Sequence, residues 1–238
     1  MPEYPMRINK YLAHHGYSTR RGADVLIERG DVQLNGRTAV VGDKVHKGDR
    51  VEVHNARPKE SYTYLAYHKP KDVVTHGAQG NEREIADTLA LQAPGLAVFP
   101  VGRLDKNSTG LILLTDDGRI VEPLLSPNYP HEKEYKVKVN ERLRSNFAEK
   151  MSSGVDIGGY TTKPCKVIKI DKHTFRIVLT EGKNHQIKKM TNALGYTVNT
   201  LHRTRIMNVR LGALRANTYR HLKQGERSTL LSSLGLET

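Results

Sequence analysis

Gly102-Arg103-Leu104-Asp105 is the stretch that decides how this chain is interpreted, and it lies between two apolar runs, residues 97–101 and 111–114. Polar residues between two apolar runs predict a strand, a turn and a second strand, with the Asp105 carboxylate at a sheet edge where it can meet a ligand. Alone, the pattern is weak, because Asp, Asn and Ser are ordinary turn residues and residues 105–110 could simply close a hairpin. Its meaning depends on the rest of the chain.

The composition is that of a soluble globular protein with one or two domains: 238 residues, of which 37% are hydrophobic and 26% charged. The one cysteine, Cys165, excludes an internal disulfide and a cysteine-based zinc site, and it favours the reducing cytoplasm. No apolar run is long enough to span a membrane, and residues 1–5 have no signal-peptide pattern. We therefore expect a cytoplasmic protein with no membrane partner.

The net charge of +13, from 38 basic and 25 acidic residues, indicates a polyanionic partner. Nucleic acid fits this charge best. An anionic membrane fits less well, because no basic amphipathic helix stands out. Charge alone does not exclude a protein that is basic only for solubility.

Residues 6–54 predict a small domain of two helices and a hairpin. Helical spacing begins at Ile8, a second helix is expected over about 20–29, and Asn35-Gly36 is typical of a two-residue hairpin turn. Residues 55–61 lack apolar periodicity and contain a proline. We place a linker at 58–61, between a domain at 1–57 and a second at 62–238.

Arg20 and Arg21 open the second predicted helix, where cations oppose the helix dipole. Helix stability therefore does not explain their placement. Their guanidinium groups could hold RNA phosphates at the helix N-terminus, or they could belong to a basic face that is merely solvated.

The second domain alternates strand-like and helical runs, which predicts an α+β fold with a mixed sheet. Strands are expected at 62–67, 97–101, 111–114, 135–139, 165–170 and 174–179, and helices at 84–91, 120–125, 143–151 and 185–194.

Further motifs extend the first stretch into a family resemblance. They are Thr109-Gly110-Leu111, Lys69-Pro70, Lys133-Glu134-Tyr135, the run 181–190 and the segment 201–207. With Gly102–Asp105 they resemble the pseudouridine synthases, and more narrowly the RsuA-like bacterial branch that modifies ribosomal RNA. Residues 131–135 and 203–209 most resemble the F-type synthases of large-subunit rRNA. Residues 6–54 resemble an S4-type RNA-binding domain, and the whole resemblance covers nearly the entire chain.

The resemblance implies a catalytic domain with one large, mixed, mostly antiparallel sheet and a central cleft, the pseudouridine synthase fold, preceded by a small S4-like α/β RNA-binding domain. The implied reaction converts uridine in large-subunit rRNA into pseudouridine: the N1–C1′ bond breaks, the flipped-out uracil rotates, and C5 joins the same sugar carbon. It needs no metal or redox cofactor. The RNA-binding cations implied in the small domain are Arg7, Lys10, Arg20 and Arg21.

The resemblance also implies site residues. Asp105 matches the catalytic aspartate, Tyr135 the tyrosine that stacks on the target base, and Lys188 the basic residue that pairs with the aspartate. The family more often has arginine at the Lys188 position, and lysine lacks the bidentate fork. The implied substrate-binding residues are Arg103, Leu201, His185 and Gln186. We expect no metal ligands, because the histidines form no recognisable set.

Each of these residues also has an ordinary structural interpretation. Tyr135 could be a strand aromatic in the core, Arg103 a partner in a turn ion pair, and Leu201 a core leucine. Two other functions stay open: a non-catalytic rRNA-binding ribosome assembly factor, and a pseudouridine synthase that acts on tRNA. We expect the protein to be a monomer.

Overall fold

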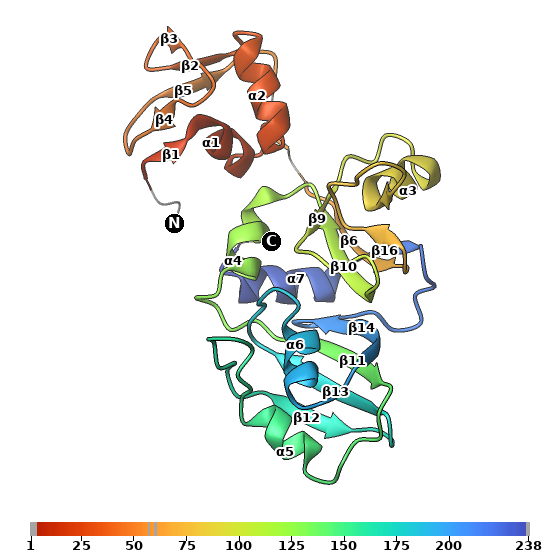
Figure 1. Cartoon of the computed structure of the whole chain (residues 1–238). Coiled ribbons are helices and arrows are strands. Elements are labelled where there is room, and N and C mark those ends of the chain that lie inside the picture. Colours follow the sequence, from red (N-terminus) through yellow and green to blue (C-terminus); the bar gives the residue numbers. More distant parts are fainter. Residues whose placement is uncertain (1–3, 57, 60, 237–238) are drawn as a thin grey trace.

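The computed structural model describes residues 4–56, 58–59 and 61–236 of the chain (Figure 1). A small N-terminal domain lies beside a larger domain that contains one long sheet. The domain ends predicted at residues 1, 57 and 238, and residue 60 of the predicted linker, lie outside the described residues. Within the described residues, no helix has the length and apolar character needed to cross a bilayer.

The small domain has the two predicted helices and the predicted hairpin. Thr19 caps the second helix, because its side chain accepts a hydrogen bond from the Gly22 amide, and Asn35 and Gly36 have the positive φ angles, 53° and 80°, of a tight hairpin turn. Ile8, Leu12 and Ile27 pack together in its core. Its elements are β1 (Met6–Arg7), α1 (Ile8–His14), α2 (Arg20–Glu28), β2 (Val32–Leu34), β3 (Arg37–Thr38), β4 (Lys44–Val45) and β5 (Val51–Val53).

The large domain is built on a nine-stranded sheet, with β12-β13-β11-β14-β10-β6-β16 in order, β9 paired with β10, and β15 with β14. These strands are β6 (Tyr64–Lys69), β9 (Phe99–Val101), β10 (Thr109–Thr115), β11 (Lys133–Val139), β12 (Lys166–Lys169), β13 (Thr174–Leu179), β14 (Val198–Ile206), β15 (Val209–Arg210) and β16 (Tyr219–His221). Only β10 and β14 pair in parallel within it. The predicted mixed, mostly antiparallel sheet is confirmed.

The parallel contact between β10 and β14 joins the two halves of the sheet. It is short, with Thr109 opposite His202 and Gly110 opposite Arg203. Gly110 has φ +111°, and a Cβ there would lie 2.5 Å from the backbone nitrogen of Arg203. Only glycine fits at this junction.

Helices cover the two faces of the sheet unequally. On one face, α3 (Ile85–Gln92) packs on β6 and β10 through Leu65 and Tyr67, while α5 (Phe147–Ser152) and α6 (Gln186–Ala193) pack on β11 and β13. On the other face, α7 (Gln224–Ser233) and α4 (Val121–Leu125) pack on β6 and β10 through Tyr64 and Ala66. The remaining elements are β7 (Val73–Val74), β8 (Arg83–Glu84) and η1 (Gly118–Ile120).

Several elements differ from the prediction. The helix predicted over 143–151 begins only at Phe147, and β14, β16 and α7 were not predicted. The α7 segment has few apolar residues and contains Gly225, so its sequence has a weak helical pattern. It folds as a helix because Leu230 and Leu231 are buried against the sheet.

Candidate active site

Asp105 lies in the loop between β9 and β10, and buried polar groups hold this loop in place. The Thr75 hydroxyl donates to the Leu104 carbonyl at 2.9 Å and accepts from the Leu104 amide at 3.0 Å. The buried Lys69 ammonium donates to the carbonyls of Val73 at 2.6 Å and of Lys106 at 3.2 Å, and burial lowers the pKa of Lys69 to about 8. The residues on both sides of Asp105 are therefore fixed.

The Asp105 carboxylate projects from this loop toward α6 and stays accessible, with 34% of its side chain exposed. The Lys188 ammonium lies 2.6 Å from Oδ2, and the His185 Nε2 lies 3.3 Å from Oδ1. The structure thus brings Asp105 next to His185 and Lys188, which lie 80 and 83 positions further along the chain. A single cation at 2.6 Å orients the carboxylate and stabilises its negative charge.

His185 is the N-cap residue of α6 and has a left-handed backbone, with φ 51°. Non-glycine residues seldom adopt this conformation, and they tend to do so at functional sites. Its side chain makes no capping bond and reaches Asp105 instead.

Tyr135 lies on β11, on the sheet face that carries α6. It is partly buried and packs against two clusters, the core beneath α6 and the cluster that contains Leu104, the neighbour of Asp105. Leu201 is opposite Val137 and Arg203 is opposite Tyr135 on β14, so all four side chains share this face. Tyr135 therefore lies on the same sheet face as α6, which carries Lys188.

Gln186 does not line the site, contrary to the prediction. It is 4% exposed, and its side-chain amide donates to Glu181 at 2.8 Å and accepts from the Lys183 amide at 2.9 Å. These bonds stabilise the turn before α6. The side chain is buried because Glu181 supplies a buried acceptor, which the sequence pattern does not reveal.

Arg103 is exposed, and among the described residues no carboxylate lies within 4.0 Å of it, so the alternative of a turn ion pair is not observed. Its guanidinium group is free to meet a ligand.

Arg203 was not predicted as a site residue. It is 4% exposed, its Nε donates to the Leu111 carbonyl at 2.7 Å, and its Nη2 has no partner among the described residues. A buried guanidinium nitrogen without a protein partner is costly, and this cost falls on the strand beside Tyr135. Only the strand register places it beside Tyr135, so the sequence pattern gave no signal.

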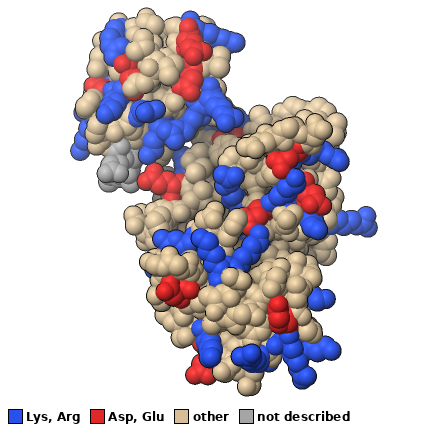
Figure 2. Space-filling view, viewed as in Figure 1, with Lys and Arg blue, Asp and Glu red and all other residues tan. Residues whose placement is uncertain are grey.

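The cations of the small domain are exposed. Arg7, Arg20 and Arg21 have no carboxylate within 4.0 Å among the described residues, whereas Lys10 forms an exposed ion pair with Glu122 of α4 at 3.2 Å. Figure 2 shows Lys and Arg side chains gathered around α1 and α2, on the side toward the large domain, and again over the region of α6. A polyanion could contact both domains on this face.

Thr75→Val tests the anchor of the loop. The substitution keeps the shape but leaves the amide and carbonyl of Leu104 unpaired, so we expect a loss of about 1–3 kcal/mol of unfolding free energy and a lower kcat. Chemical denaturation and single-turnover kinetics measure the two effects. Thr75→Ser, which keeps the hydroxyl, is the control, and equal kcat for both variants would contradict the anchoring role.

Comparisons with known proteins were made for the sequence and for the fold. The family model described as RNA pseudouridylate synthase matches residues 63–193, and the S4 domain model matches residues 6–51. The dual-specificity RNA pseudouridine synthase RluF of Escherichia coli K12 is 41% identical over 230 residues, covering 95% of this chain and 78% of that protein. Ribosomal large subunit pseudouridine synthase B of Bacillus subtilis is 30% identical over 228 residues, covering 92% of this chain and 93% of that protein. A solved pseudouridylate synthase superposes with a TM-score of 0.69 at 30% identity, covering 94% of this chain and 99% of that one.

Proposed function

The chain belongs to the RNA pseudouridylate synthase family and carries an S4 domain, and from this premise we propose that it isomerises uridine in large-subunit ribosomal RNA with Asp105 as its catalytic carboxylate. The observation that carries the proposal is the accessible Asp105 carboxylate, held between Lys188 and His185. The protein acts as a cytoplasmic monomer. The domain boundaries that we propose remain 1–57, 58–61 and 62–238.

The chemistry needs an anion beside the sugar C1′ or the uracil ring, whether the carboxylate attacks carbon or assists elimination. Asp105 supplies the anion, and Lys188 orients it through Oδ2 while leaving the side chain accessible. Tyr135 stacks on the flipped uracil and Leu201 forms an apolar wall, so the detached base is held and water is excluded. The exposed Arg103 binds a phosphate or base oxygen of the RNA.

Ribosomal RNA of the large subunit is the proposed substrate because one relative, from Bacillus subtilis, is named for it. The relative from Escherichia coli is named a dual-specificity enzyme, which favours a second RNA substrate, and tRNA is the second candidate that we test. Pseudouridine mapping on total RNA from cells lacking the protein distinguishes them. We expect lost sites in large-subunit rRNA; losses only in tRNA would support the tRNA synthase, and no loss anywhere would leave only an assembly factor.

Lys188→Met tests the partner of Asp105. Removing the cation should lower kcat about 10²–10³-fold, because an anion at the site loses its stabilising charge. Lys188→Arg, which keeps the charge, should retain most of the activity. Single-turnover kinetics at saturating RNA measure this, and equal rates for both variants would show that the charge is not used.

Arg20→Glu with Arg21→Glu tests the S4-type domain. Reversing two exposed cations should weaken RNA binding and reduce the slope of log affinity against log salt by about 1 for each phosphate that the variant no longer binds. Filter binding at several salt concentrations measures both quantities. Val25→Thr, an exposed change on the same helix, is the neutral control. An unchanged salt slope would count against RNA binding at this helix.

A further inference from the structure

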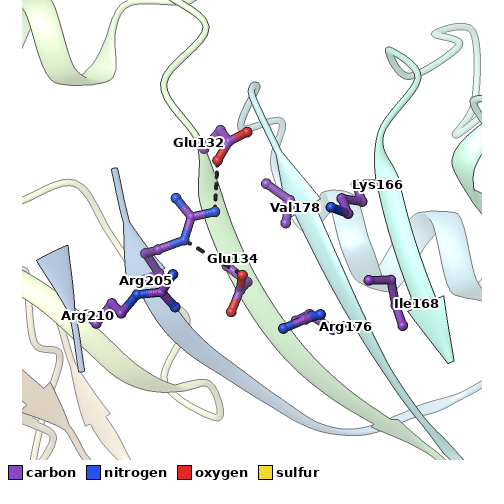
Figure 3. Close-up of a pocket in the computed structure, with 8 residues that line it drawn as sticks. All are labelled: Glu132, Glu134, Lys166, Ile168, Arg176, Val178, Arg205 and Arg210. Atoms are coloured by element: carbon purple, nitrogen blue, oxygen red, sulfur yellow. Dashed lines mark hydrogen bonds and ion pairs between the residues drawn. The ribbon is translucent and has the colours of Figure 1, made fainter. Parts of the chain in front are cut away.

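On the sheet face opposite the candidate active site, β12, β13 and β11 contribute no residue to the buried cluster beneath α7 and α4. Side chains alternate along a strand, so Glu134 and Lys136 of β11 point away from the face that carries Tyr135. The cluster beneath α7 and α4 contains residues of β6 and β10, with Ile206 of β14 and Val209 of β15, whose side chains alternate with those of Arg205 and Arg210. An open hollow of about 240 Å³ lies on this part of the sheet and is lined chiefly by Glu132, Glu134, Lys166, Arg176, Arg205 and Arg210. Figure 3 shows these side chains on their strands.

The hollow has a surplus of unpaired positive charge. Arg205 forms ion pairs with both carboxylates that line the hollow, at 2.8 Å from Glu132 and 3.7 Å from Glu134. It also donates a hydrogen bond to the Met207 carbonyl at 2.7 Å. Lys166, Arg176 and Arg210 are exposed, and no carboxylate among the described residues lies within 4.0 Å of any of them. Three cations on this face therefore lack a counter-ion.

The strand register places like charges directly opposite one another. Lys136 of β11 faces Arg176 of β13, and Arg205 of β14 faces Arg210 of β15. Like charges in such cross-strand pairs destabilise a sheet. The stability of the sheet therefore does not explain the pattern, whereas an anion lying across the strands would relieve the repulsion.

We propose that this surface, the rear basic face formed by Lys136, Lys166, Arg176 and Arg210, binds the phosphate backbone of the substrate RNA at a distance from the target uridine. The inference rests on the RNA substrate of the proposed function. From β12 to β15 the face spans roughly 19 Å, at about 4.8 Å per strand, which matches a backbone segment of several nucleotides. Such contacts position a structured RNA and do not read its sequence.

An RNA fits this face better than an acidic protein does. The apolar side chain within the hollow that is most exposed is Ile168, at 37%, and the strands present no aromatic anchor there. Protein interfaces depend on buried apolar or aromatic anchors at their centre. Guanidinium groups on an open polar surface are typical of phosphate recognition.

The test is the double variant Lys166→Glu with Arg176→Glu. Its matched control is Lys150→Glu with Lys172→Glu, which changes the net charge equally at exposed positions outside the hollow. We expect the rear-face variant to bind a transcript of large-subunit rRNA at least about 10-fold more weakly than the control at physiological salt, with a shallower salt slope. Both variants should bind short oligouridylate like the unaltered protein, and both should keep its kcat at saturating rRNA.

Thermal unfolding separates binding from folding in this experiment. Arg176→Glu replaces the like-charge pair with Lys136 by an opposite-charge pair. The Tm of the Arg176→Glu protein should therefore not fall below that of the unaltered protein. Equal affinity of the two double variants for the rRNA transcript overturns the proposal. If, in addition, only the rear-face variant binds polyglutamate more weakly, the partner of this face is an acidic protein and not RNA. If the unaltered protein forms no pseudouridine in any RNA, the proposed function fails instead.

Discussion

Asp105→Asn is expected to abolish pseudouridine formation, with kcat lower by on the order of 10⁴-fold or more, because the amide is a poor nucleophile and base. The substitution preserves the size of the side chain, and Thr75 and Lys69 still hold the loop through backbone groups. Release of tritium from RNA labelled at uracil C5 measures turnover, since C5 loses its hydrogen when it bonds to the sugar. RNA affinity should change little.

Asp72→Asn is the matched control for this experiment. Asp72 is an exposed carboxylate close to the same loop, and its amide donates to the Lys106 carbonyl, a bond that the substitution preserves. The control should keep nearly full activity. Retained turnover by Asp105→Asn would remove Asp105 from the chemistry, and equal losses in both variants would indicate a general disturbance of the loop.

Gly110→Ala is expected to cost at least about 3 kcal/mol of unfolding free energy, the largest stability effect among these substitutions. A Cβ would collide with the Arg203 backbone, which belongs to the neighbouring strand and cannot move aside without separating β10 from β14. The backbone at Gly110, with φ +111°, is also strained for any other residue. Urea unfolding measures the loss.

Gly225→Ala is the control, because this glycine lies in α7 and a Cβ there would have open space within 4 Å. It should be neutral or stabilising by up to about 1 kcal/mol. Unfolding free energies that agree between the two variants would contradict the close approach of β10 to β14. Since this junction also places Arg203 beside Tyr135, Gly110→Ala should reduce activity even where the protein still folds.

Local features of the fold could be predicted from the sequence. The helix over about 20–29 and the hairpin turn at Asn35-Gly36 depend on neighbouring residues only, and both are confirmed. Elements that depend on distant partners were missed. β14 inserts between β11 and β10 although its sequence is rich in polar residues, and α7 forms because two leucines are buried against a sheet made earlier in the chain.

In the candidate site, too, contacts between residues that are distant in the sequence could not be predicted from local patterns. The approach of Lys188 to Asp105 was expected from a family resemblance, since no local pattern connects residues 83 positions apart. Gln186 was expected to bind substrate because of the family resemblance, and its burial depends on Glu181, which lies close to it only in the folded chain. Arg203 was missed because its neighbours are set by strand register, with a bulge between Glu134 and Tyr135.

The central claim is that one carboxylate, fixed between two basic side chains of α6 and its cap, carries out uridine isomerisation in ribosomal RNA. The most direct measurement is nucleotide-resolution pseudouridine mapping of unmodified large-subunit rRNA after incubation with the purified protein or with Asp105→Asn. We expect pseudouridine at one or a few uridines with the unaltered protein and none with the variant. Modification of the same uridines by both proteins, or by neither, would contradict the account.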